Sequence, residues 1–257
     1  MAEAKTAVAH KPIWLDLSSS DAAGSRDFYS KLFGWKVEVN PDPQYGGYAL
    51  AKIAGKDVAG IGPKMSPEAP TAWLIYIGTA DAADSAKKAK AAGGNVLAEP
   101  MQVGPQGTMA VIQDPSGAAI GVWQPGQMAG SPVMGDANAY GWAELNARGF
   151  AKAEPFYTKV FGWGEKKSDM GENMEYTEFL LSGESIAGGM EMNPMVPAEV
   201  PSYWLAYFTV ADVDKTYEKA TEAGARSLLE PQDFPGGRFA ILSDPQGATF
   251  GLLKMKQ

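Results

Sequence analysis

Hydrophobic and polar residues alternate along several short stretches of the chain, and a period of two predicts β-strands. In the first of these, residues 13–17, alternation places Trp14 and Asp16 on one face and the aliphatic residues on the other. A following stretch has apolar residues three and four apart, which predicts a helix that Asp21 caps and Gly34 ends. In the rest of the first half we expect strands at 35–39, 48–53, 58–62, 73–78, 96–98, 109–113 and 118–124, and a second helix at 80–92.

Two landmarks of this first half return later in the chain. Residues 28–35 read FYSKLFGW and residues 156–163 read FYTKVFGW, an offset of 128. Residues 114–117 read DPSG and return as DPQG at 244–247, an offset of 130. Two landmarks in the same order at nearly one spacing indicate two homologous halves. Asp114 and Asp244 lie in the predicted turns, where we expect them to cap backbone amides.

The second half repeats the alternation of strands and helices. It predicts strands at 142–146, 176–181, 186–192, 204–210, 239–243 and 249–254, with helices at 151–161 and 213–223. We therefore expect an α+β fold in which four tandem βαβββ units form two half-open barrels. The predicted boundaries are an N-terminal tail at 1–10, a first domain at 11–125, a Gly/Pro/Met-rich linker at 126–137 and a second domain at 138–257.

Composition and charge exclude several classes of protein. There is no cysteine, which excludes disulfides, thiolate catalysis and cysteine-based metal sites. The net charge of −8, without a basic cluster, argues against a nucleic-acid partner. No apolar run reaches the ~18 residues needed to span a bilayer. We expect a cytoplasmic protein with a small-molecule partner, and a monomer with an internal pseudo-two-fold or, alternatively, a homodimer.

The repeated FYxxxFGW helix ends and the DPxG turns together resemble the vicinal oxygen chelate superfamily. This superfamily includes glyoxalase I, bleomycin resistance proteins and extradiol dioxygenases. The duplicated form, with Trp-x-Asp/Glu-Leu opening each half, is similar to a two-domain subgroup of actinobacterial glyoxalase-like proteins, often labelled hydroxylases or secreted antigens. The resemblance covers nearly the whole chain and implies the paired half-open barrels described above.

The resemblance also implies one divalent metal, held by His and Glu side chains from the first and last strands of the units. This chain departs from that pattern. Its single histidine, His10, falls in the predicted tail, where we expect a solvated side chain. We therefore expect no cofactor, although an all-oxygen metal site using Asp16, Glu144 or Glu191 is an alternative. The positions that match the expected ligands hold Trp14, Trp142, Leu74, Leu205, Gly121 and Gly251.

The pairing of an aromatic residue with an acid in each half points to a site. An acid on the inner side of a sheet costs several kcal/mol unless it is hydrogen-bonded, paired, metal-bound or hydrated. Asp16 and Glu144 are therefore the candidate catalytic residues, with capping of nearby amides as the competing explanation. Strand alternation and composition suggest an aromatic, methionine-containing pocket, although core packing would explain each such residue singly. The predicted ligand-binding residues are Trp14, Trp73, Tyr76, Trp123, Trp142, Asn146, Met190, Met192, Trp204 and Tyr207.

Three functions fit these residues. The leading hypothesis is a glyoxalase-like protein without a catalytic metal, which binds a small aromatic or electrophilic molecule. The alternative is an enzyme of the vicinal oxygen chelate type, a metal-dependent lyase/isomerase or hydroxylase/dioxygenase, that uses Asp16 or Glu144 as a general base. A third hypothesis is a surface-interaction protein whose barrels are filled by their own side chains.

Overall fold

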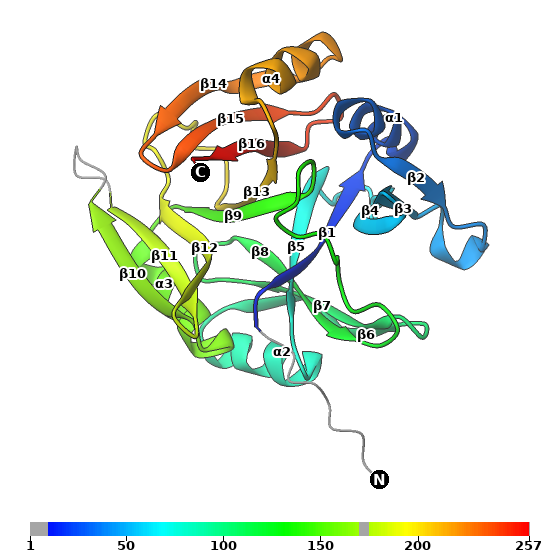
Figure 1. Cartoon of the computed structure of the whole chain (residues 1–257). Helices are drawn as coiled ribbons and strands as arrows, with labels where there is room; N and C mark the ends of the chain where they lie inside the picture. The colour runs from blue at the N-terminus through cyan, green and yellow to red at the C-terminus, as the bar shows by residue number, and fades with distance from the viewer. Residues whose placement is uncertain (1–9, 170–174, 257) are drawn as a thin grey trace. The chain divides into compact units, whose positions relative to one another are not determined.

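The computed structural model describes residues 10–169 and 175–256. Within these residues the chain forms the α+β fold of four βαβββ modules that the repeats predict (Figure 1). The first half consists of β1 (Pro12–Ser19), α1 (Ala22–Phe33), β2 (Lys36–Val39), the 3-10 turn η1 (Pro43–Tyr45), β3 (Ala49–Ile53), β4 (Lys56–Pro63), β5 (Ala72–Gly78), α2 (Ala82–Ala91), β6 (Asn95–Val103), β7 (Gly107–Gln113) and β8 (Ala119–Pro125). The second half consists of β9 (Tyr140–Ala147), α3 (Phe150–Phe161), β10 (Gly164–Asp169), β11 (Glu175–Leu181), β12 (Glu184–Glu191), β13 (Tyr203–Thr209), α4 (Val213–Glu222), β14 (Arg226–Phe234), β15 (Gly237–Ser243) and β16 (Thr249–Met255).

The strands belong to two mixed sheets of eight strands. One has the order β2-β3-β4-β1-β5-β8-β7-β6, and the other has the corresponding order β10-β11-β12-β9-β13-β16-β15-β14. The first strand of a module pairs in parallel with its last strand, as β1 does with β4 and β5 with β8. The hairpins that complete each module are antiparallel.

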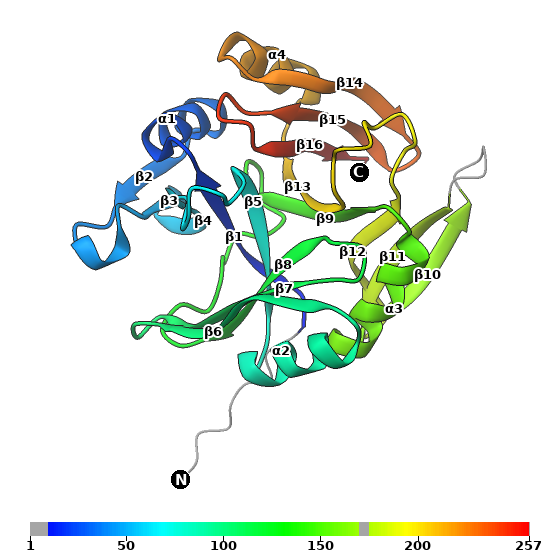
Figure 2. The same ribbon diagram turned by 180° about the vertical axis from the view of Figure 1, so that it is seen from behind.

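The chain also divides into two compact units, and each of these takes segments from both halves of the sequence. Unit 1 comprises Ile75–Gly130 and Ala143–Trp204, together with residues 10–13. Unit 2 comprises Trp14–Leu74, Ser131–Trp142 and residues 205–256. In unit 1, α2 lies beside α3; in unit 2, α1 lies beside α4 (Figures 1 and 2).

Helix α1 shows how local sequence sets an element. The Asp21 side chain accepts a hydrogen bond from the Gly24 amide at its start, and Gly34 ends it in the left-handed conformation at φ 73°. The predicted cap and stop are thus confirmed. The side chains that α1 buries are spaced three and four apart, as expected for one helical face.

A buried tyrosine of that face joins the two sequence landmarks. Within unit 2 the Tyr29 hydroxyl donates to Asp244 Oδ2 at 3.0 Å and accepts from Trp73 Nε1 at 2.9 Å. Asp244 Oδ1 accepts from the amides of its own turn, which confirms the predicted cap. The FYxxxFGW helix and the DPxG turn are therefore hydrogen-bonding partners, although they come from opposite halves of the sequence.

Unit 1 contains the same arrangement with the halves exchanged. The Tyr157 hydroxyl donates to Asp114 Oδ2 at 2.7 Å and accepts from Trp204 Nε1 at 2.8 Å. Asp114 Oδ1 also accepts from the turn amides of Ser116 and Ala118. Burial and the neighbouring carboxylate raise the pKa of Tyr29 and of Tyr157 well above the usual tyrosine value. Both phenols are therefore held as neutral donors.

Three strands differ from the sequence prediction. β6 runs from Asn95 to Val103, past the predicted end at 98, and its pairing with β7 shifts register around Pro100. An outer strand tolerates proline at such an irregularity because the missing amide need not pair. β10 and β14 were not separately predicted. They are the outermost strands of their sheet and expose most of their side chains, so their sequences lack the hydrophobic alternation that identifies a half-buried strand.

The predicted tail and linker are more tightly held than their composition suggests. His10 is half-buried; its Nδ1 donates to the Phe161 carbonyl at 2.8 Å, and its own carbonyl accepts from Trp163 Nε1 at 2.5 Å. The expectation of a solvated His10 was therefore wrong, because backbone and ring contacts anchor it; the other tail residues lie outside the described part of the chain. In the linker, the Met128 carbonyl accepts from Trp123 Nε1 at 2.8 Å. Among the helices of the described chain, none is long and apolar enough to span a bilayer.

Candidate functional site

The Asp16 carboxylate lies at the centre of a hydrogen-bonded group in unit 2, formed by residues of β1 and by Tyr48, which directly precedes β3. Its Oδ1 accepts from Trp14 Nε1 at 2.8 Å and from the Tyr48 hydroxyl at 2.6 Å. Asp16 is half-buried on β1 and stands opposite Gly60 of β4 in the strand register. Two donors on one oxygen stabilise the ionised carboxylate. These hydrogen bonds offset the desolvation free energy of placing an acid on the inner side of the sheet.

Gly60 makes room for this group. A Cβ atom at Gly60 would overlap both the Tyr48 hydroxyl and Asp16 Oδ1. The phenol and the carboxylate therefore meet directly over the backbone of β4, where any other residue would displace them. We call Trp14, Asp16, Tyr48 and Gly60 the Asp16 cluster.

The second half repeats this set at the same spacing, with a glutamate in place of the aspartate. Adding 128 to the numbers of the Asp16 cluster gives Trp142, Glu144, Tyr176 and Gly188. Glu144 stands opposite Gly188 in the register of β9 and β12, and a Cβ at Gly188 would overlap the Tyr176 hydroxyl. Tyr48 and Tyr176 were missed in the sequence analysis, although the constant offset of 128 identifies both.

Glu144 has polar neighbours within unit 1. Its Oε1 accepts from Asn146 Nδ2 at 3.1 Å. Asn146 in turn stands opposite Met190 in the register of β9 and β12. Burial, followed by the negative charge of Glu144, raises the pKa of Tyr203, a half-buried residue at the start of β13. We call Glu144, Asn146, Tyr176, Gly188, Met190 and Tyr203 the Glu144 cluster.

Tyr76 and Tyr207 are placed alike in the two units. Tyr76 of β5 stands opposite Gly121 of β8, and a Cβ at Gly121 would overlap the tyrosine ring. Tyr207 of β13 has the same relation to Gly251 of β16. Each ring therefore covers the backbone of the neighbouring strand. Within unit 1, Trp123 packs edge-on against Tyr76 with ring centroids 6.4 Å apart.

Other predicted ligand-binding residues lie in the interior. Trp73 and Trp204 are 5% and 6% exposed, and their indole N–H groups donate to the buried tyrosines of the two units. Met192 follows the end of β12 and is 4% exposed, with its amide bonded to the Ala147 carbonyl. A ligand-binding role for these three residues remains a prediction. Trp14 is 1% exposed and therefore supports Asp16 from within the core, whereas Trp142 is half-buried.

In the part of the chain that the structure describes, the side chains at the expected ligand positions do not fit a resident divalent metal. The family resemblance implies a ligand at positions 121 and 251, but the rings of Tyr76 and Tyr207 occupy the space in which a side chain there would begin. Glu191, an alternative oxygen ligand, instead accepts from the amides of Gly149 and Phe150 at 2.8 and 2.7 Å and caps α3. No group of three or more His, Cys, Asp or Glu residues within 10–169 and 175–256 is arranged to hold a metal.

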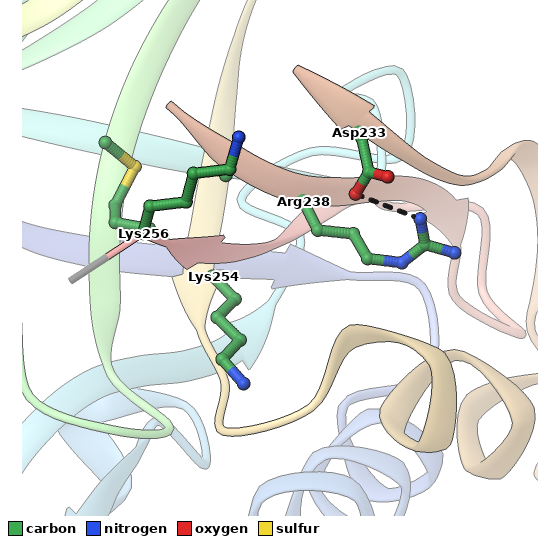
Figure 3. Close-up of a pocket in the computed structure, with 6 residues that line it drawn as sticks. Asp233, Arg238, Lys254 and Lys256 are labelled. Atoms are coloured by element: carbon green, nitrogen blue, oxygen red, sulfur yellow. Dashed lines mark hydrogen bonds and ion pairs between the residues drawn. The ribbon is translucent and has the colours of Figure 1, made fainter. Parts of the chain in front are cut away.

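A surface hollow of about 420 Å³ lies at the ends of β14, β15 and β16 in unit 2 (Figure 3). Arg238 there pairs with Asp233 at 3.2 Å and, through two nitrogens, with Asp214 at 2.8 and 2.7 Å. Lys254 of β16 and Lys256, which follows that strand, also line the hollow. These groups are ion-paired or exposed to solvent, and the lining includes none of the predicted site residues. The hollow therefore lies apart from the Asp16 and Glu144 clusters in the sequence and in its chemistry.

Known proteins match this chain in a way that reflects its duplication. A family model described as "Glyoxalase/Bleomycin resistance protein/Dioxygenase superfamily" matches residues 11–122 and again residues 139–252. The chain is 38% identical over 249 residues to the Mycobacterium tuberculosis protein named "Putative glyoxylase CFP32", covering 95% of this chain and 94% of that protein. It is 36% identical over 260 residues to "Anthracycline biosynthesis protein DnrV" of Streptomyces peucetius, covering 96% and 94%.

Solved structures share the fold at low identity. A Mn(II)-bound glyoxalase from Novosphingobium aromaticivorans superposes with a TM-score of 0.65 at 16% identity, covering 96% of this chain and 82% of that chain. The 2,3-dioxygenase LapB from Pseudomonas sp. KL28 has a TM-score of 0.64 at 13% identity, covering 98% and 94%. At these identities the likeness shows the fold alone.

Proposed function

Because this chain belongs to the Glyoxalase/Bleomycin resistance protein/Dioxygenase superfamily, we propose that it binds a small planar aromatic or electrophilic molecule without a catalytic metal. The observation that carries the proposal is an arrangement that occurs in both repeats: an acid and a tyrosine lie next to a glycine of the neighbouring strand. Aromatic rings therefore lie beside polar groups that are held in place. Apolar walls with a few convergent polar groups are the usual composition of a small-molecule site.

The relatives support the class of ligand. A Streptomyces protein that matches nearly the whole chain is named for anthracycline biosynthesis, and anthracyclines are planar and polycyclic. Such a ring system suits a site with tyrosine and tryptophan side chains, because flat aromatic faces stack. Among the residues that the structure describes, no set of side chains fits a divalent metal, and this supports a binding mode that uses hydrogen bonds and ring contacts.

A thermal-shift experiment tests binding. The purified chain would be heated with anthraquinone-2-sulfonate, a soluble planar probe, with and without EDTA. At a hundred times Kd, binding adds about 2.7 kcal/mol of stability, which corresponds to roughly 5–10 °C for a chain of this size. We expect the same shift with EDTA and less than about 0.1 equivalent of any transition metal by mass spectrometry.

Matched variants locate the site. Gly60→Ala and Gly188→Ala displace the tyrosine hydroxyls and should reduce the shift. Gly164→Ala is the control, because a Cβ there makes only ordinary contact with Leu180. A stoichiometric, EDTA-removable metal, or no shift with any planar probe at 1 mM, would overturn the proposal.

A second candidate function is catalysis, which the 2.6 Å hydrogen bond between Tyr48 and Asp16 favours. A phenol bonded to a carboxylate can give a proton to a developing oxyanion while the acid accepts one elsewhere. Methylglyoxal, an electrophilic dicarbonyl, is a suitable first substrate because two relatives carry the name glyoxylase. If Asp16→Asn and Glu144→Gln both keep the full turnover of the unaltered chain, these residues are not its general bases.

A further inference from the structure

The Asp16 and Glu144 clusters share one plan but have diverged in composition. The acid lengthens from Asp16 to Glu144. At the next position on the same face, Ser18 of β1 corresponds to Asn146 of β9. Both substitutions enlarge the side chain in the second repeat, and the change from serine to asparagine also adds a polar atom on that face.

Two further differences lie on the neighbouring strands. Ser18 stands opposite Gly62, whereas Asn146 stands opposite Met190. On the strand that opens the next module, Ala72 corresponds to Tyr203, at an offset of 131 that Trp73 and Trp204 share. In all four pairs the second repeat therefore has the larger side chain. Three of the four differences also add or extend a polar group.

These polar groups are complementary to a particular kind of ligand. Glu144 is an acceptor, and Asn146 holds it by donating to Oε1 at 3.1 Å. Tyr203 is kept as a neutral phenol because burial and the Glu144 charge raise its pKa, so it remains a donor. An acceptor beside a donor fits a molecule that carries a hydroxyl next to a carbonyl.

We propose that the Glu144 cluster, and not the Asp16 cluster, recognises the polar edge of the ligand, and that the ligand is an aromatic hydroxy-ketone. Its hydroxyl donates to Glu144, and its carbonyl accepts from the Tyr203 hydroxyl. Asn146 acts as a positioning residue, and Met190 packs against the ring. This inference rests on the proposed binding function. It specifies the class of the ligand and the repeat that binds the polar edge of the ligand.

The experiment compares two soluble probes that differ only in their hydroxyl groups. Binding of 1,4-dihydroxyanthraquinone-2-sulfonate and of anthraquinone-2-sulfonate would be measured by quenching of tryptophan fluorescence. We expect the hydroxylated probe to bind the unaltered chain at least about tenfold more tightly, since one good hydrogen bond to a charged group is worth roughly 1.5–3 kcal/mol.

Variants then assign the preference to one repeat. Glu144→Gln should reduce the preference to less than about threefold, because the ligand hydroxyl loses its charged acceptor. Tyr203→Phe removes the donor to a carbonyl that both probes carry, so it should weaken both probes by a similar factor. Asn146→Ser, which restores the residue of the first repeat, should reduce the preference partially. Ser18→Ala and Asp16→Asn are the matched controls and should keep the tenfold preference.

The outcomes separate the two proposals. A preference that survives Glu144→Gln, or that Asp16→Asn abolishes, overturns the assignment to the Glu144 cluster and leaves the binding function intact. Unchanged affinity of both probes for Tyr203→Phe overturns the role of Tyr203. Equal affinity for the two probes overturns the hydroxy-ketone class. Failure of both probes to bind below 1 mM overturns the inference and the binding function together.

Discussion

Replacing Tyr29 with phenylalanine tests the account of how unit 2 is held together. The side chain is 0% exposed, and its hydroxyl joins Asp244 at 3.0 Å to Trp73 at 2.9 Å. Tyr29→Phe leaves the ring in place but removes the hydrogen bond to a buried carboxylate, worth about 1.5–3 kcal/mol, and strands a buried indole N–H at about 1–3 kcal/mol. The expected loss of stability is therefore roughly 3–5 kcal/mol, a large share of the ~5–15 kcal/mol of an ordinary domain.

The penalty should depend on pH in a defined direction. Burial raises the pKa of Asp244, while the Ala248 amide and the Tyr29 hydroxyl oppose that rise. Removing the hydroxyl raises the folded-state pKa further, so the folded chain then holds its proton to higher pH than the unfolded chain. The cost is accordingly larger at pH 7 than at pH 4, because the protonated acid needs the donor less.

Urea denaturation followed by tryptophan fluorescence measures both effects. With a slope of about 2–3 kcal/mol per molar urea, the midpoint at pH 7 should fall by more than about 1 M. Tyr157→Phe should behave alike in unit 1, because its hydroxyl makes the same two bonds. Tyr45→Phe is the control, since its half-buried ring lies in the η1 turn. If Tyr29→Phe costs no more than Tyr45→Phe, or costs more at pH 4 than at pH 7, the reasoning is wrong.

Three further outcomes are expected. Burial raises the pKa of Tyr29, Tyr140 and Tyr157, and also that of Tyr203, so an unfolded chain loses at least three protons above pH 10 that the folded chain keeps. Stability should therefore fall by at least roughly 4 kcal/mol per pH unit there, and urea midpoints at pH 9, 10 and 11 check it. Glu191→Ala removes the acceptor for two amides at the start of α3 and should cost about 0.5–2 kcal/mol, whereas the exposed Glu199→Ala should cost almost nothing by the same assay. Gly121→Ala should destabilise unit 1 by about 1–3 kcal/mol because the new methyl group meets the Tyr76 ring, and a melting temperature equal to that of Gly164→Ala would contradict that packing.

The sequence predicts well wherever one local rule decides the structure. The helix from Asp21 to Gly34 follows from a cap, an apolar face and a stop residue that lie within one short segment. The duplication is visible because whole modules repeat at offsets of 128 and 130. The α+β fold and the superfamily could therefore be identified without coordinates.

The parts that depend on pairing between distant segments were not predictable in this way. Nothing in the local sequence shows that Tyr29 bonds to Asp244 instead of Asp114, because both aspartates lie in the same kind of turn. Tyr48 opens the predicted strand at 48–53, but it was overlooked because its partners, Asp16 and Gly60, lie on other strands and local alternation does not show that they meet. The prediction of a solvated His10 was wrong for a related reason. Its partners, Phe161 and Trp163, lie more than 150 residues away in the sequence.

The exchange of modules between the halves has a consequence for biosynthesis. The Tyr29–Asp244 bond closes a loop of 215 residues, so unit 2 cannot finish folding until Asp244 has emerged from the ribosome. Such a high contact order predicts slow acquisition of the native state. A fragment that stops at residue 125 would leave Tyr29 without its carboxylate, and a fragment that starts at residue 138 would leave Asp244 without its phenol. Mixed together, the two fragments supply each other's missing partner, so the split chain should reassemble where neither piece alone is stable.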